Sequence, residues 1–249
     1  MVLGAVDTWD LSSHRPRHTD SMSNAAEDEP GLRLVRSVFP VFAGHTIDGV
    51  LALDKFMGTV FALADGTLVS VSHVLAEPEL GALCIVQKST NGRYVPHAIS
   101  RAVRHPMGYD LAVARAPSLL TDSPLRVAAD EAQRGTDVFT YGFPLTHSSA
   151  EGSVVGRRHE LQSRYLQGYV TRAFSFQPSG SRIVTPTVEV DMPVPPGISG
   201  APLIAVGTTQ VVGVLFGQHG TEQGPNDRYT WGLAHRVVSL KHLLEHAAV

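Results

Sequence analysis

Short apolar runs rich in β-branched residues, each closed by a glycine or proline turn signal, recur along most of this chain. Glycine and proline account for 23 and 16 of the 249 residues, so few uninterrupted stretches remain in which a long helix could form. Three Asp-Gly or Asn-Gly pairs, which favour turns with positive φ, lie beside these runs at residues 48–49, 65–66 and 91–92. The pattern therefore predicts an all-β fold of short strands.

The predicted strands form two groups, separated by a polar, proline-bearing connection at residues 117–131. Two β-rich halves of similar length are typical of paired barrels with a cleft between them. We therefore expect an N-terminal barrel over residues 32–125 and a C-terminal barrel over residues 126–234. The strands expected in the first are residues 38–43, 58–64, 67–74, 82–87 and 111–116; those in the second are 136–141, 169–176, 183–190, 202–205, 210–216 and 230–233.

The two ends of the chain depart from this pattern. Residues 1–31 are polar and show no apolar period, which predicts a mobile tail. Residues 235–249 carry Val238, Leu240, Leu243 and Leu244 at roughly helical spacing, which predicts a C-terminal helix.

Composition argues against several kinds of partner and location. A formal net charge of −3 gives no basic footprint for nucleic acid, and no run of 18 apolar residues could span a membrane. The N-terminus lacks the basic start and apolar run of a signal peptide. Cys84 is the single cysteine, so no internal disulfide can form and the fold must depend on its core. These features favour a cytoplasmic protein that binds neither nucleic acid nor membrane.

Three short motifs carry the candidate chemistry. A lone histidine, an aspartate before an apolar run or a Gly-x-Ser-Gly turn is common in proteins without catalytic meaning. Here, however, they occur together, in one order and each with an apolar strand beside it. In chain order they are Gly58–Phe61 with Leu68–Val74, Tyr109–Val113, and Gly197–Leu203 with Val211–Val214.

With these motifs the chain resembles the trypsin-like, chymotrypsin-fold serine endopeptidases, most nearly the disulfide-free bacterial Deg/HtrA-type protease domains. Residues 136–145 also resemble the opening strand of that family's second barrel, and the resemblance covers roughly residues 40–240. It implies two six-stranded antiparallel β-barrels followed by the C-terminal helix. It also implies a serine endopeptidase that acts on protein or peptide substrates and needs neither a cofactor nor a metal.

The resemblance assigns a role to each motif. Ser199 is the expected nucleophile, His73 the general base and then acid, and Asp110 the carboxylate that orients the imidazole. These types are needed together because a serine hydroxyl attacks well only when a neighbouring imidazole, held in one tautomer, removes its proton. The N–H groups of Gly197 and Ser199 are expected to form the oxyanion hole.

The resemblance also locates the primary substrate pocket. The expected pocket residues are Pro193, six positions before the nucleophile, and the strand residues Val214, Leu215 and Phe216. Because none of them carries a charge, a substrate lysine or arginine would be desolvated without a partner, and we expect cleavage after small or medium apolar residues. An inward-facing Asp191 would favour basic residues and an inward-facing His219 would favour glutamate, but both are interpreted as solvated loop residues.

Three alternatives remain open at this stage. The double barrel could be a catalytically silent binding or sensing module, although such a scaffold would not need all three triad residue types. His242, Glu245 and His246 match an H-x-x-E-H zinc pattern, but a third ligand from farther downstream is missing, which favours solvated helix positions. A regulatory protein partner that orders the loop before Ser199 is a further candidate.

Overall fold

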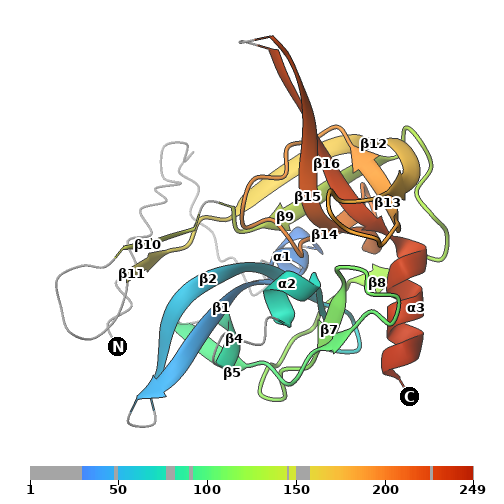
Figure 1. The fold of residues 1–249 in the computed structure, drawn as a ribbon. Helices are drawn as coiled ribbons and strands as arrows, with labels where there is room; N and C mark the ends of the chain where they lie inside the picture. Colours follow the sequence, from blue (N-terminus) through green and yellow to red (C-terminus); the bar gives the residue numbers. More distant parts are fainter. Residues whose placement is uncertain are drawn as a thin grey trace, which may run out of the picture.

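The computed structural model describes residues 30–47, 50–76, 82–89, 92–144, 146–149, 158–224 and 227–248. These residues form two large β-sheets, one from each half of the chain, and a terminal helix packs against both (Figure 1). The expected all-β fold with a C-terminal helix is confirmed. The predicted tail lies outside the described residues except for Pro30 and Gly31, which begin a short helix, α1 (Pro30–Val35).

The first sheet has the strand order β5-β4-β1-β2-β3-β7-β6, and all of its pairs are antiparallel. Four of its core residues, Val41, Phe61, Leu68 and Leu111, have no exposed surface. The strands are β1 (Val38–Ile47), β2 (Val50–Ala62), β3 (Leu68–Ser70), β4 (Ala82–Lys88), β5 (Tyr94–Ala98), β6 (Val103–Arg104) and β7 (Ala112–Ala114).

The second sheet has the order β14-β9-β12-β13-β16-β15-β8, and β14 also pairs with β15, which closes six of the strands into a barrel. The two-residue strand β8 adds to β15 in the parallel direction. A separate hairpin pairs β10 with β11. The strands are β8 (Arg126–Val127), β9 (Asp137–Gly142), β10 (His147–Ser149), β11 (Arg158–Glu160), β12 (Arg164–Phe176), β13 (Thr185–Val190), β14 (Pro202–Ala205), β15 (Gln210–Gly224) and β16 (Asp227–Arg236).

One predicted strand, residues 67–74, is wrong over its second half. β3 ends at Ser70, and a one-turn helix, α2 (Ser72–Leu75), follows. The chain turns here because Val71, Val74 and Leu75 are spaced as i, i+3 and i+4, and all three enter the core when the backbone is helical. This turn leaves His73 on the exposed side of α2.

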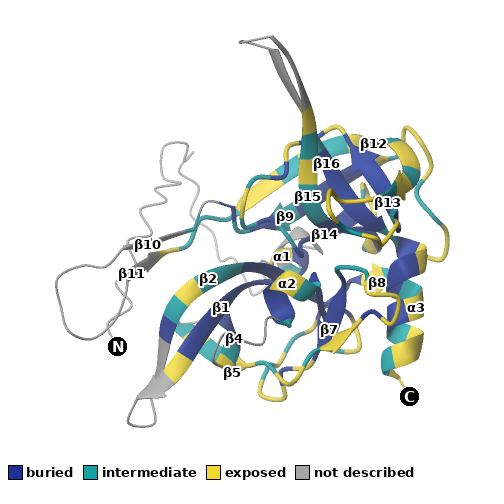
Figure 2. Ribbon diagram, viewed as in Figure 1, coloured by how far each residue is buried: buried dark blue, intermediate teal, exposed yellow. Residues whose placement is uncertain are grey.

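The C-terminal helix α3 (Val237–Ala247) joins the two halves of the molecule. Leu240 and Leu243 belong to the core of the first sheet, and Val237 belongs to the core of the second. Val238, which the sequence pattern placed on the apolar face, is 47% exposed, because the helix turns Val237 inward instead. The buried stripe of α3 is visible in Figure 2.

Candidate active site

The imidazole of His73 and the carboxylate of Asp110 form the best-defined part of the site. His73 Nδ1 lies 2.7 Å from Asp110 Oδ2, and the main-chain N–H of His73 donates to Asp110 Oδ1 at 3.0 Å. One carboxylate therefore fixes both the backbone and the ring of His73. Because an ionised carboxylate only accepts hydrogen bonds, Nδ1 carries the proton and Nε2 is the basic nitrogen of the neutral ring.

Asp110 stays ionised at neutral pH in this environment. Burial acts to raise the pKa of Asp110, but the hydrogen bonds and charge of His73 outweigh it, and the pKa lies below its usual range. The loop that carries Asp110 is held in place by main-chain bonds from His105 N to Leu111 O (2.9 Å) and from Leu111 N to Tyr109 O (2.7 Å). Ser72 Oγ also donates to Leu111 O at 2.8 Å, which ties this loop to α2.

Ser199 is held between the two sheets. Its carbonyl accepts a hydrogen bond from Thr59 N of β2 at 3.0 Å, and the next residue, Gly200, donates to Leu215 O of β15 at 2.7 Å. The Ser199 hydroxyl donates to Phe216 O at 3.4 Å. The nucleophile predicted from the sequence is therefore anchored by one strand from each half of the molecule.

The backbone before Ser199 requires a glycine at position 197. Gly197 has a φ of 97°, and a Cβ atom there would lie 2.5 Å from Phe143 O. Within the described part of the chain, the N–H groups of Gly197 and Ser199 donate to no other acceptor. Both donors therefore remain available for an oxyanion, as the predicted oxyanion hole requires.

Thr59 has a structural role that the sequence motif did not reveal. Its side chain has no exposed surface, and its Oγ1 donates to Gly197 O at 2.7 Å and accepts from Phe143 N at 3.2 Å. A single hydroxyl thus connects β2 of the first sheet with the loop that precedes the serine and with the end of β9.

The predicted pocket residues lie in different surroundings. Val214 and Leu215 have no exposed surface and belong to the two cores, so they offer no side-chain surface to a substrate. Pro193 is exposed, whereas its neighbours Met192 and Val194 are buried. Phe216 lines a cavity of about 150 Å³ that also exposes Asp110.

Asp191 and His219, the two residues that could have made the predicted apolar pocket polar, both interact with other groups of the protein. A hydrogen bond with the Asp191 carboxylate raises the pKa of Tyr169, which places the Asp191 side chain beside that hydroxyl. His219 Nε2 lies 2.5 Å from the buried carboxylate of Glu189, which also binds Arg172 at 2.7 Å.

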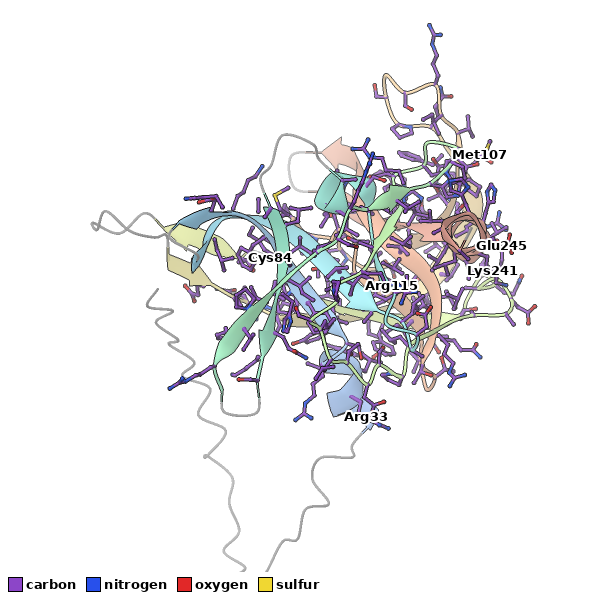
Figure 3. All side chains as sticks on the ribbon, turned by 90° about the horizontal axis from the view of Figure 1, so that it is seen from below. Arg33, Cys84, Met107, Arg115, Lys241 and Glu245 are labelled. Atoms are coloured by element: carbon purple, nitrogen blue, oxygen red, sulfur yellow. The ribbon has the colours of Figure 1, made fainter. Side chains whose placement is uncertain are left out.

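The H-x-x-E-H segment lies on α3, and the ring of His242 packs edge-on against His105 with a centroid distance of 5.1 Å. The described part of the chain contains no group of three His, Cys, Asp or Glu side chains arranged to hold a metal. None of the described helices is long and apolar enough to cross a membrane. Cys84, which is labelled in Figure 3, is buried, and burial raises the pKa of its thiol to about 12.

Sequence reasoning did not single out His235 of β16. Its side chain is only 1% exposed, yet it lines the same cavity as Asp110 and Phe216. The available signal was a histidine next to the apolar residues Leu233 and Ala234, but the sequence alone does not show which residues surround it.

Comparisons with known proteins agree with the fold and identify the family. The family of trypsin-like peptidase domains matches residues 58–214. The active form of the Rv3671c protease from M. tuberculosis superimposes with a TM-score of 0.61 and 18% identity, covering 93% of this chain and 92% of that chain. The HtrA-type protease AlgW with a decapeptide gives a TM-score of 0.59 and 16% identity, covering 87% of this chain and 67% of that chain. No curated protein is significantly similar to the chain in sequence.

The family match spans more than half of the chain and includes all three motifs in full. The protein therefore belongs to the trypsin-like peptidases and is a serine endopeptidase, a hydrolase of peptide bonds. The predicted resemblance to trypsin-like and Deg/HtrA-type proteases is confirmed.

Proposed function

We propose that this endopeptidase cleaves its substrates through a catalytic triad of Ser199, His73 and Asp110 and a covalent acyl-enzyme intermediate. The observation that carries the proposal is the double hydrogen bond from His73 to the Asp110 carboxylate, at 2.7 Å from the ring and 3.0 Å from the main chain. This arrangement fixes the tautomer in which Nε2 can accept a proton, as a general base for a serine requires.

In the first half of the proposed reaction, Ser199 Oγ attacks the carbonyl carbon of the scissile peptide bond while His73 Nε2 takes the hydroxyl proton. The negative charge that develops on the carbonyl oxygen is stabilised by the N–H groups of Gly197 and Ser199. The C–N bond then breaks, His73 returns the proton to the leaving amine, and the acyl group stays on Ser199. Asp110 remains ionised throughout and stabilises the imidazolium.

In the second half, a water molecule takes the place of the amine. His73 accepts a proton from the water as its oxygen attacks the acyl carbon, and the same two N–H groups stabilise the second oxyanion. When the ester bond breaks, the proton passes from His73 to Ser199 Oγ, which restores the free enzyme and releases the new carboxyl terminus.

We propose a preference for small or medium apolar residues before the scissile bond. The support is that the nearby carboxylates of Asp191 and Glu189 have partners in Tyr169 and Arg172. In addition, Val190 and Val194 pack so closely on Gly232 that a Cβ there would lie 2.8 and 2.6 Å from their methyl groups. A long basic side chain would find no unpaired carboxylate among these residues.

The triad proposal is tested by turnover of a quenched-fluorescence protein substrate. Ser199→Ala and His73→Ala should each reduce kcat by several orders of magnitude while the melting temperature stays near that of the wild type. The double variant should be no worse than the worse single variant, because the residues act as a unit. Wild-type turnover in Ser199→Ala, with the same substrate and protein preparation, would exclude the assignment.

A further inference from the structure

His235 lines the same cavity as Asp110 and Phe216. It comes from β16, where its backbone pairs with Val214 of β15 and Thr187 of β13. Its imidazole packs on the ring of Phe216 with a centroid distance of 4.4 Å. Phe216 is the residue whose carbonyl accepts the Ser199 hydroxyl, so His235 supports the strand that positions the nucleophile.

The same imidazole faces Asp110. Both residues line the cavity of about 150 Å³. The charge of the Asp110 carboxylate and a hydrogen bond with the Asp110 main chain both act to raise the pKa of His235. Neither ring nitrogen of His235 has an aligned hydrogen-bond partner among the described residues. A buried N–H without a partner is costly, and the main-chain carbonyl of Asp110 is a group that can accept it.

The ring of His235 is neutral at physiological pH. Burial, together with the charges of His105 and His73, lowers the pKa of His235 to about 4, although Asp110 acts in the opposite direction. A neutral imidazole has one N–H and one unprotonated nitrogen. Because the main-chain carbonyl of Asp110 can only accept a hydrogen bond, the tautomer of His235 that turns its N–H toward this carbonyl is favoured.

We propose that His235 is a positioning residue, which uses its N–H and its packing on Phe216 to keep Asp110 and the strand beside Ser199 in place. The inference rests on the proposed triad and extends it to a residue outside that triad. Asp110 needs such support because its side chain is 38% exposed toward the cavity, where water could otherwise compete for the carboxylate. Without the N–H of His235, the carboxylate would hold the ring of His73 less firmly.

Substitutions at position 235 distinguish the contribution of the N–H from the contribution of the ring volume. His235→Leu fills the space but has no donor, whereas His235→Asn and His235→Gln each retain an amide N–H, close to the positions of Nδ1 and Nε2 respectively. We expect kcat of the leucine variant to fall about 10- to 100-fold with little change in KM, as for a misplaced catalytic group. At least one amide variant should stay within about threefold of the wild type.

A spectroscopic signal reports on positioning directly. The proton between His73 Nδ1 and Asp110 Oδ2 should give a low-field ¹H resonance in the wild type. This resonance should broaden or disappear in His235→Leu and persist in the better amide variant. Loss of packing alone would not distinguish the leucine from the amide side chains in this way.

His97 provides a matched control. It is also buried, at 8% exposure, its Nε2 has no partner among the described residues, and it lies on the edge strand β5. His97→Leu should change stability but leave kcat and the low-field resonance unchanged.

Several results would overturn the role of His235. Wild-type kcat in a folded His235→Leu protein would do so, and so would equal losses in the leucine and both amide variants. If the leucine variant does not fold, ¹⁵N spectra of the wild type decide, because a charged His235 ring at pH 7 contradicts the inference. Failure of a fluorophosphonate to label wild-type Ser199 would instead overturn the triad proposal, so the two failures are distinguishable.

Discussion

Replacement of Thr59 by valine isolates the contribution of one buried hydroxyl. Valine has nearly the same shape as threonine but cannot form the hydrogen bonds that join Thr59 Oγ1 to Gly197 O (2.7 Å) and Phe143 N (3.2 Å). The substitution therefore leaves the core packing in place and removes the link between β2 and the loop before Ser199.

The expected loss of stability follows from those two bonds. Each contributes about 1 kcal/mol net, and a main-chain group left unpaired in the protein adds a desolvation cost of about 1–3 kcal/mol. Gly197 and Phe143 are only partly buried, so water can repair some of this loss. We expect Thr59→Val to lower the free energy of unfolding by about 2–3 kcal/mol, which for a chain of this size corresponds to roughly 4–12 °C in Tm.

Activity should fall more than stability alone explains. Gly197 supplies one proposed oxyanion donor, and loss of such a donor costs roughly 10²- to 10³-fold in kcat, so a loosened Gly197 should cost at least about tenfold. Urea unfolding and kcat measured on the same samples test both expectations. Thr59→Ser is the control, because it keeps the hydroxyl and removes only a methyl group. Thr59→Val with unfolding free energy within about 0.5 kcal/mol of the wild type and full kcat would refute the reasoning.

Three further predictions follow from the same geometry. Gly200→Ala should destabilise the protein by about 2–5 kcal/mol in urea unfolding, because its Cβ would lie 1.9 Å from Ser70 Oγ at a φ of 90°; an unchanged midpoint would contradict this packing. Asp110→Asn should reduce kcat on the order of 10⁴-fold with an unchanged circular dichroism spectrum, and a loss below about tenfold would show that the carboxylate does not orient His73. The pKa of His235 is depressed from 6.5 to about 4 in the folded state, so its contribution to stability is present above pH 6.5 and is lost as pH falls through about 4. Between pH 6.5 and pH 4 the free energy of unfolding of the wild type should therefore fall by roughly 3 kcal/mol more than that of His235→Asn. An equal fall in the two proteins would contradict this expectation.

Local sequence patterns correctly predicted the strands that bury one apolar face. Residues 82–87 and 202–205 were expected as strands and correspond to β4 (Ala82–Lys88) and β14 (Pro202–Ala205), because their apolar residues point into a core. By contrast β2 begins at Val50 rather than at residue 58. Its first part pairs with β1 and packs Leu53 and Phe56 in a small cluster, but Asp54 and Lys55 interrupt the apolar pattern of the sequence there.

The candidate active site was also predicted only in part. The resemblance to trypsin-like proteases, carried by the three motifs and their order, predicted that His73 and Asp110 come together, and the two side chains lie 2.7 Å apart. The side chains around the pocket could not be predicted, because a one-residue difference in register decides whether Pro193 or Val194 faces inward. The role of His235 could not be predicted for a related reason. It depends on an interaction between β16 and the loop of Asp110, which are far apart in the chain.

The triad proposal is tested most directly by reaction with a fluorophosphonate, followed by intact-mass measurement and peptide mapping. The wild type should gain the mass of one adduct, located on Ser199, with loss of turnover in proportion to labelling. Ser199→Ala should gain none, and His73→Ala should react far more slowly because its serine is not activated. Absence of an adduct on an active wild-type preparation, or an adduct on any residue other than Ser199, would contradict the proposed nucleophile.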